Sequence, residues 1–136
     1  MANYRVVCPS CKKPLNIPDD CTCPMCRNPI MIPRGGMIQI YRMGNFVGGA
    51  AGAGIYINGQ PYGHVANRGT VMIPLPFGDY MVHMVLNMNR KCNDPVIKLT
   101  PEKPVAYLKA HVRVGAFVNS MIIEPADPAS MPPPAD

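Results

Sequence analysis

Four cysteines near the amino terminus are spaced so that they could bind one metal ion. Two copies of the motif Cys-Pro-x-Cys, fifteen positions apart, supply Cys8, Cys11, Cys23 and Cys26. A Cys-x-x-Cys turn places two sulfurs on one side of a metal, and two such turns complete the four-sulfur tetrahedron that suits zinc. Such a shell leaves no open position for a substrate. The sequence therefore predicts one structural zinc ion.

The repeat extends beyond the four cysteines. A basic residue, Lys12 or Arg27, follows the second cysteine of each motif. Because four thiolates around Zn²⁺ carry a net charge of about −2, we predict that these cations offset it. Cys21 aligns with Val6, so we predict a small buried side chain there; the alternative is that Cys21 replaces Cys23 as a ligand. Rubredoxins share the Cys-Pro-x-Cys turn but usually continue with glycine and an aromatic residue, so zinc is favoured over iron.

The chain divides by composition into three parts. Residues 1–35 contain the repeat, residues 36–125 contain short apolar segments broken by glycine and proline, and residues 126–136 form a proline-rich tail that we expect to be disordered. With 17 prolines and 12 glycines among 136 residues, no segment is typical of a long helix. We predict a mainly β protein, with a zinc ribbon at 1–35 and an antiparallel β-sandwich of seven or eight strands at 36–125.

Alternating apolar residues and turn signals predict where the strands lie. The expected strands cover residues 37–42, 54–58, 60–65, 70–75, 80–87, 96–99, 105–112 and 118–123. Asn58-Gly59 predicts a two-residue hairpin turn, since both residues tolerate positive φ. A polar loop is expected at 88–94. Along 80–87 the even-numbered side chains are expected to face the core, and Met81, His83 and Val85 the opposite, more mixed face.

Several of these segments resemble a known family. They are Ile38-Gln39-Ile40-Tyr41-Arg42, Phe46-Val47-Gly48-Gly49-Ala50, Ile55-Tyr56-Ile57-Asn58-Gly59-Gln60 and Pro76-Phe77-Gly78-Asp79-Tyr80. Together they are similar to an uncharacterised family of small bacterial β-sandwich domains, akin to PEGA-type domains and often found in lipoproteins. The resemblance implies a fold over residues 36–125 and no catalytic residue. Unlike the lipoprotein members, this chain is expected to have a zinc ribbon and no signal peptide.

Three further features of the sequence have the residue types of a functional site. The glycine-rich loop at 44–54 lacks the following helix and the Gly-Lys-Ser/Thr motif of a phosphate loop. His64, His83 and His111 could gather on a sheet face, but no carboxylate recurs at a spacing that would orient an imidazole, so a histidine site is not favoured. Cys92 lies beside cations that could lower its pKa; a free loop cysteine is the simpler interpretation.

These observations favour a non-enzymatic protein. A saturated metal site and a sandwich without convergent polar residues offer surfaces and no chemistry, so we expect a protein-interaction or adaptor module with an unknown protein partner. The alternative is a nucleic-acid-binding zinc ribbon, which the formal charge of +5 permits, although the basic residues are scattered. No membrane span is expected, and cysteines used for metal fit the reducing cytoplasm.

Overall fold

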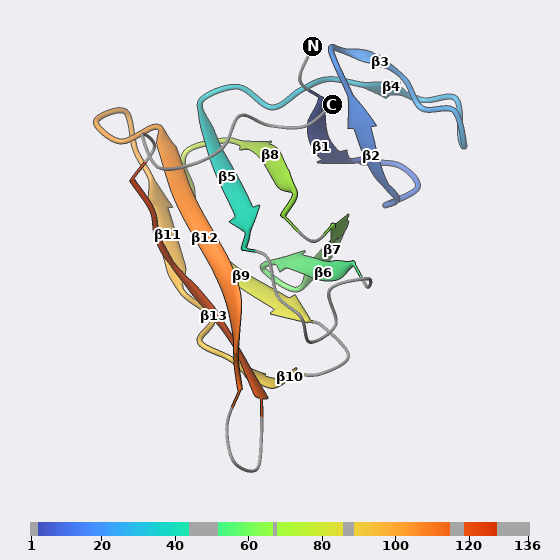
Figure 1. Ribbon diagram of the computed structural model, residues 1–136. Helices are drawn as coiled ribbons and strands as arrows, with labels where there is room; N and C mark the ends of the chain where they lie inside the picture. Colours follow the sequence, from blue (N-terminus) through green and yellow to red (C-terminus); the bar gives the residue numbers. More distant parts are fainter. Residues whose placement is uncertain (1–2, 44–51, 67, 86–88, 115–118, 128–136) are drawn as a thin grey trace.

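The protein is built from β-strands alone in the part of the chain that the structure describes (Figure 1). The computed structural model describes residues 3–43, 52–66, 68–85, 89–114 and 119–127. Its strands are β1 (Tyr4–Val7), β2 (Pro14–Ile17), β3 (Cys21–Thr22), β4 (Pro29–Ile30), β5 (Gly36–Arg42), β6 (Ala53–Ile57), β7 (Gln60–Val65), β8 (Thr70–Leu75), β9 (Gly78–Val85), β10 (Asn89–Cys92), β11 (Val96–Leu99), β12 (Val105–Val114) and β13 (Asn119–Pro125). The mainly β prediction is confirmed.

The first four strands form two hairpins that repeat each other. Val6 pairs with Leu15 in the β1–β2 hairpin, and Cys21 pairs with Ile30, fifteen positions later, in the β3–β4 hairpin. Both hairpins send aliphatic side chains into one small core with the buried cysteines Cys8 and Cys23. The aliphatic members are Val6, Ile17, Ile30 and Ile32. The sequence repeat is therefore also a repeat in strand register.

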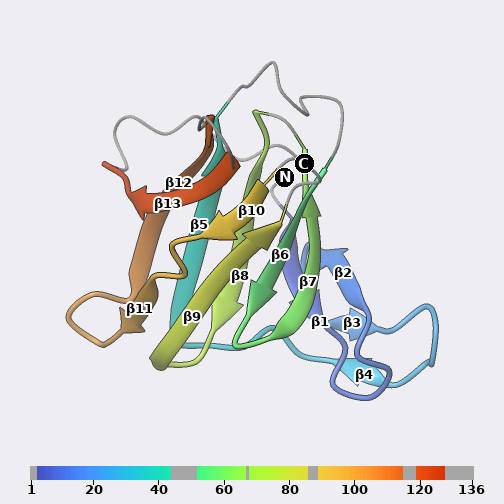
Figure 2. The same cartoon turned by 90° about the horizontal axis from the view of Figure 1, so that it is seen from below.

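The remaining nine strands form two sheets that enclose the main core (Figure 2). One sheet has the order β10-β13-β12-β5-β8 and the other the order β11-β9-β6-β7. Ile40, Ile55 and Met84, which come from different strands of these sheets, are each fully buried between them. Burying one such side chain stabilises the fold by about 1.5–3 kcal/mol, so this core holds the two sheets together.

The prediction of a purely antiparallel sandwich with seven or eight strands is wrong in two respects. The sheets contain nine strands, and two of the pairings, β5 with β12 and β10 with β13, are parallel. Parallel neighbours require a long crossover rather than a hairpin. Between β5 and β12 the chain enters the opposite sheet three times, at β6–β7, β9 and β11, and returns to the first sheet at β8 and β10 in between.

The expected polar loop at 88–94 is also wrong, because it contains β10. Asn93 fixes the end of this strand against β13. Its Oδ1 accepts a hydrogen bond from the amide of Ile123 at 2.8 Å, and its Nδ2 donates to the carbonyl of the same residue at 2.7 Å. The Asn58-Gly59 hairpin is confirmed, with φ of 51° and 82°. Residues 44–51 of the glycine-rich loop and 128–136 of the tail lie outside the described residues.

Strand β8 explains how the two amino-terminal hairpins β1–β4, here called the ribbon, sit on the two sheets β5–β13, here called the sandwich. Val71, Ile73 and Leu75 face the main core, yet the alternating residues Thr70, Met72 and Pro74 are buried as well. A strand is buried on both faces only when other parts of the protein cover each face. The main core covers one face of β8, and β1 packs against β8 on the other. The ribbon therefore covers the outer face of β8 (Figure 1).

Candidate metal centre

The four cysteine sulfurs of the ribbon meet at one point. Sγ of Cys8 lies 3.5 Å from Sγ of Cys26, and Sγ of Cys11 lies 3.7 Å from Sγ of Cys23. All four sulfurs lie within 4.8 Å of one another. Zn–S bonds of about 2.3 Å in a tetrahedron place sulfurs about 3.8 Å apart, whereas a disulfide requires about 2.05 Å. The four cysteines are free thiols, so their spacing fits a metal ion and excludes a disulfide.

Backbone hydrogen bonds shape the two Cys-Pro-x-Cys turns identically. The amide of Lys12 donates to the carbonyl of Cys8 at 2.9 Å, and the amide of Arg27 donates to that of Cys23 at 2.8 Å. Backbone amides also point at the sulfurs, since the amide of Cys11 bonds Cys8 and the amide of Cys26 bonds Cys23. Hydrogen bonds to a thiolate stabilise its charge, so each turn is arranged to hold anionic sulfur.

Hydrogen bonds and burial both shift the pKa values of the four thiols. The backbone amides lower the pKa of Cys8, Cys23 and Cys26 despite their burial. At Cys11 the Lys13 amide acts in the same direction, but burial and hydrogen bonds with the other three thiols raise the pKa to about 11. Because a metal binds cysteine as thiolate, metal binding must displace any proton that these thiols still carry.

Lys12 and Arg27 have a backbone role that the sequence analysis missed. Both adopt left-handed backbone conformations, with φ of 63° and 64°, at equivalent positions of the two turns. Residues with a Cβ atom adopt this conformation at a cost of about 1–2 kcal/mol. Rubredoxins usually have glycine at this position, where it adopts positive φ without strain. A basic residue in its place could therefore have suggested a strained backbone. The predicted charge compensation by these exposed side chains stays a prediction.

Cys21 lies outside the group of four and is exposed. The prediction that it is buried is therefore wrong. Its counterpart Val6 is buried in the small core of the two hairpins, whereas Cys21, on the two-residue strand β3, does not belong to that core. The two hairpins share a register but differ in what covers them.

Polar contacts fasten the ribbon to the sandwich. Arg5 of β1 donates from Nη1 to the carbonyl of Tyr62 in β7 at 2.8 Å. Gly63 allows this approach, because a Cβ atom there would lie 2.6 Å from the same nitrogen. Its φ of 82° also favours glycine.

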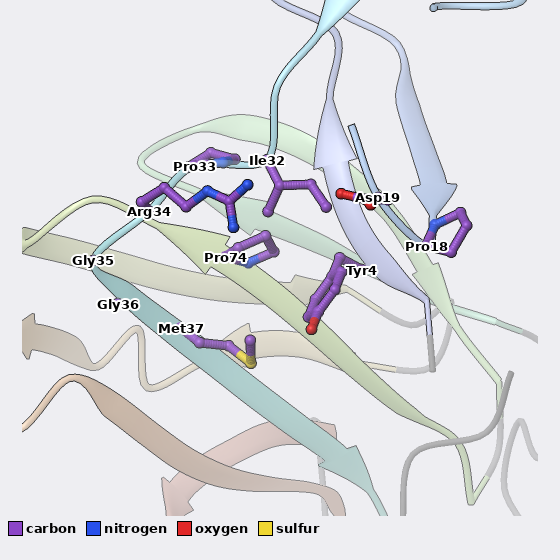
Figure 3. A pocket seen from close by; sticks show the side chains of 10 residues that line it. All are labelled: Tyr4, Pro18, Asp19, Ile32, Pro33, Arg34, Gly35, Gly36, Met37 and Pro74. Atoms are coloured by element: carbon purple, nitrogen blue, oxygen red, sulfur yellow. The ribbon is translucent and has the colours of Figure 1, made fainter. Parts of the chain in front are cut away.

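A pocket of about 380 Å³ lies where the ribbon meets the sandwich (Figure 3). Tyr4 and Ile32 contribute from the ribbon, and Met37 and Pro74 from β5 and β8. Arg34 lies at its edge with 77% of its side chain exposed and forms a 3.5 Å ion pair with Asp20. The pocket thus combines apolar side chains with Asp19 and an exposed, ion-paired arginine.

The histidines do not gather as a set, yet one of them has partners that the sequence analysis missed. Nδ1 of His83 lies 2.6 Å from Oδ1 of Asp94, so the expectation that no carboxylate orients an imidazole is wrong. Cys92 joins this pair and lies on β10 rather than in a loop. Burial raises the pKa of the Cys92 thiol, contrary to the lowering considered for its cationic neighbours. His64 and His111 belong to neither metal-capable group of the described residues.

No helix in the described part of the chain is long and apolar enough to cross a membrane. No protein-family model matches the sequence, and no curated protein or solved structure matches it significantly. The resemblance to PEGA-type domains therefore stays a prediction.

Proposed function

We propose that this is a non-enzymatic protein-interaction or adaptor module in which one zinc ion has a structural role. The four thiolates of the ribbon would saturate a tetrahedral ion, so this metal would have no position left for substrate. Its role would be to hold together a segment of about 35 residues, which buries too little apolar surface to fold alone.

The observation that carries the interaction hypothesis is the pocket between ribbon and sandwich. Its walls come from both parts, so it would exist only when zinc holds the ribbon in place. Tyr4, Pro74 and Met37 offer an apolar surface for one inserted side chain, while exposed Arg34 could pair with an acidic group beside it. A partner segment that combines an apolar and an acidic residue would suit it best.

Binding of nucleic acid is the second candidate, and the observation in its favour is the position of three cations. Lys12, Lys13 and Arg27 are all exposed at the two cysteine turns. They could contact phosphates, although stacking aromatics, which single-strand binders usually combine with cations, do not accompany them in the sequence of these turns.

Affinity capture from a lysate of the source organism, with and without nuclease, tests these two candidates. We expect a few proteins to be retained despite nuclease and to be lost with Arg34→Glu, which changes an exposed pocket residue. Arg113→Glu is the matched control, because it reverses an exposed charge at the end of β12 remote from the ribbon. Recovery that disappears with nuclease would instead support nucleic-acid binding, and retention unaffected by Arg34→Glu would exclude the pocket as the binding surface.

A further inference from the structure

His83, Cys92 and Asp94 form a second group of metal-ligating side chains on the sandwich. His83 comes from β9, Cys92 from the end of β10, and Asp94 from the segment that follows β10. One donor atom from each lies within 4.8 Å of the other two. We propose that these three residues bind a divalent metal ion of the zinc type, independently of the ribbon.

The donor set suits this metal. Imidazole nitrogen, thiolate sulfur and carboxylate oxygen are the three ligand types that zinc takes in proteins. A neutral His83, a thiolate at Cys92 and a carboxylate at Asp94 would balance the charge of Zn²⁺, whereas two ionised acids this close would repel each other without a cation. The metal therefore stabilises the thiolate and the carboxylate together.

The distances leave room for the ion after a small movement. Bonds of about 2.0–2.3 Å place tetrahedral donors about 3.4–3.6 Å apart. The 2.6 Å contact between His83 and Asp94 must therefore open by about 0.8 Å as the ion replaces the shared proton. Both side chains are more than one-third exposed, at 37% and 39%, so they have space to move.

The backbone holds Asp94 in place from both sides. The side chain of Asn93 binds the backbone of Ile123 in β13, and the carbonyl of Pro95 accepts a 3.0 Å hydrogen bond from Val82 in β9. Between these anchors Asp94 has a φ of 46°, although the residue before a proline ordinarily adopts an extended conformation. Strained backbone that its surroundings impose is common at ligand-binding sites.

The site also has an open side. Three protein ligands leave a fourth tetrahedral position for water or another ligand. His83 and Asp94 line an open pocket of about 440 Å³ whose surface is largely apolar, and the other lining residues are Tyr56, Gly59, Met81 and Val85. The centre of the Tyr56 ring lies 5.9 Å from that of the His83 ring. Strand β10, which carries Cys92, lies beside β9, which carries His83 (Figure 2). The fourth position would therefore be accessible from solvent through this pocket.

Metal stoichiometry tests the proposal. The full-length protein, stripped by chelator under reducing conditions, is titrated with Zn²⁺ in competition with a chromophoric chelator, and bound metal is counted by elemental mass spectrometry. We expect two equivalents in the native protein and one in His83→Ala and in Cys92→Ser. Asp94→Asn, which keeps the shape of the side chain, should weaken the second site by at least about tenfold. Cys8→Ser should lose the ribbon equivalent and keep the other one.

Two matched controls keep the result specific. His64→Ala removes an exposed histidine and Cys21→Ser an exposed cysteine outside both groups, so each should retain two equivalents. Thermal unfolding of every variant shows whether the sandwich is intact. If His83→Ala or Cys92→Ser disrupts folding, the metal stoichiometry of Asp94→Asn decides whether the second site exists. One equivalent in the native protein, or a second one that all three changes leave intact, would overturn the proposal. Neither result would affect the interaction hypothesis, which depends on the ribbon metal.

Discussion

The left-handed backbone at Lys12 allows the roles of charge and backbone to be separated by substitution. Lys12→Ala removes the charge and keeps a Cβ atom at a φ of 63°, whereas Lys12→Gly removes both. The left-handed conformation costs a Cβ-bearing residue about 1–2 kcal/mol, and part of the relief is offset by the greater freedom of glycine in the unfolded chain. We therefore expect Lys12→Gly to exceed Lys12→Ala in stability by about 1 kcal/mol.

Zinc affinity measures this difference directly, because folding of such a small ribbon is coupled to metal binding. A difference of about 1 kcal/mol corresponds to about a fivefold tighter apparent Kd for the glycine variant in a chelator competition. Arg27, with the same conformation in the second turn, should behave in the same way. The comparison between Lys12→Ala and the native lysine reports the charge effect separately.

Lys13 is the matched control, since it is exposed, adjacent and outside the left-handed region. There glycine should be worse than alanine by about 0.5–1 kcal/mol, so the order of the two variants reverses between neighbouring positions. A weaker zinc affinity for Lys12→Gly than for Lys12→Ala would refute the argument from backbone strain.

Three other perturbations have defined outcomes. Chelation or Cys8→Ser should expose residues 1–35 to limited proteolysis and leave the sandwich resistant, because metal binding contributes on the order of 10 kcal/mol to folding of such a segment; simultaneous cleavage of both parts would show one folding unit. Gly63→Ala should destabilise the protein more than Gly59→Ala in urea unfolding. Both glycines have a φ of 82°, so each substitution costs about 1–2 kcal/mol, but only the Cβ atom at position 63 would lie 2.6 Å from Nη1 of Arg5. Iodoacetamide should modify exposed Cys21 faster than half-buried Cys92, because burial raises the pKa of the Cys92 thiol. Peptide mass spectrometry measures the two rates, and equal rates would contradict this expectation.

The features that the sequence determined by itself are local or repeated ones. The fifteen-residue repeat predicted which four cysteines converge, since each Cys-Pro-x-Cys turn is closed by hydrogen bonds between residues four or five apart. Strand positions such as Thr70–Leu75 and the turn at Asn58-Gly59 were also predicted correctly. Alternation of side chains and tolerance of positive φ are properties of neighbouring residues, so they can be recognised without knowledge of the fold.

Only the tertiary structure decided which distant segments meet. The parallel pairing of β5 with β12 depends on how the chain crosses between sheets, and the exposure of Cys21 depends on which side chains fill the small core of the two hairpins. His83 and Asp94 are eleven residues apart and become partners because β10 is held to β13. Such contacts follow from the packing of whole sheets. Which strands become neighbours depends on how much apolar surface the whole core buries, so the pairing leaves no fixed spacing in the sequence.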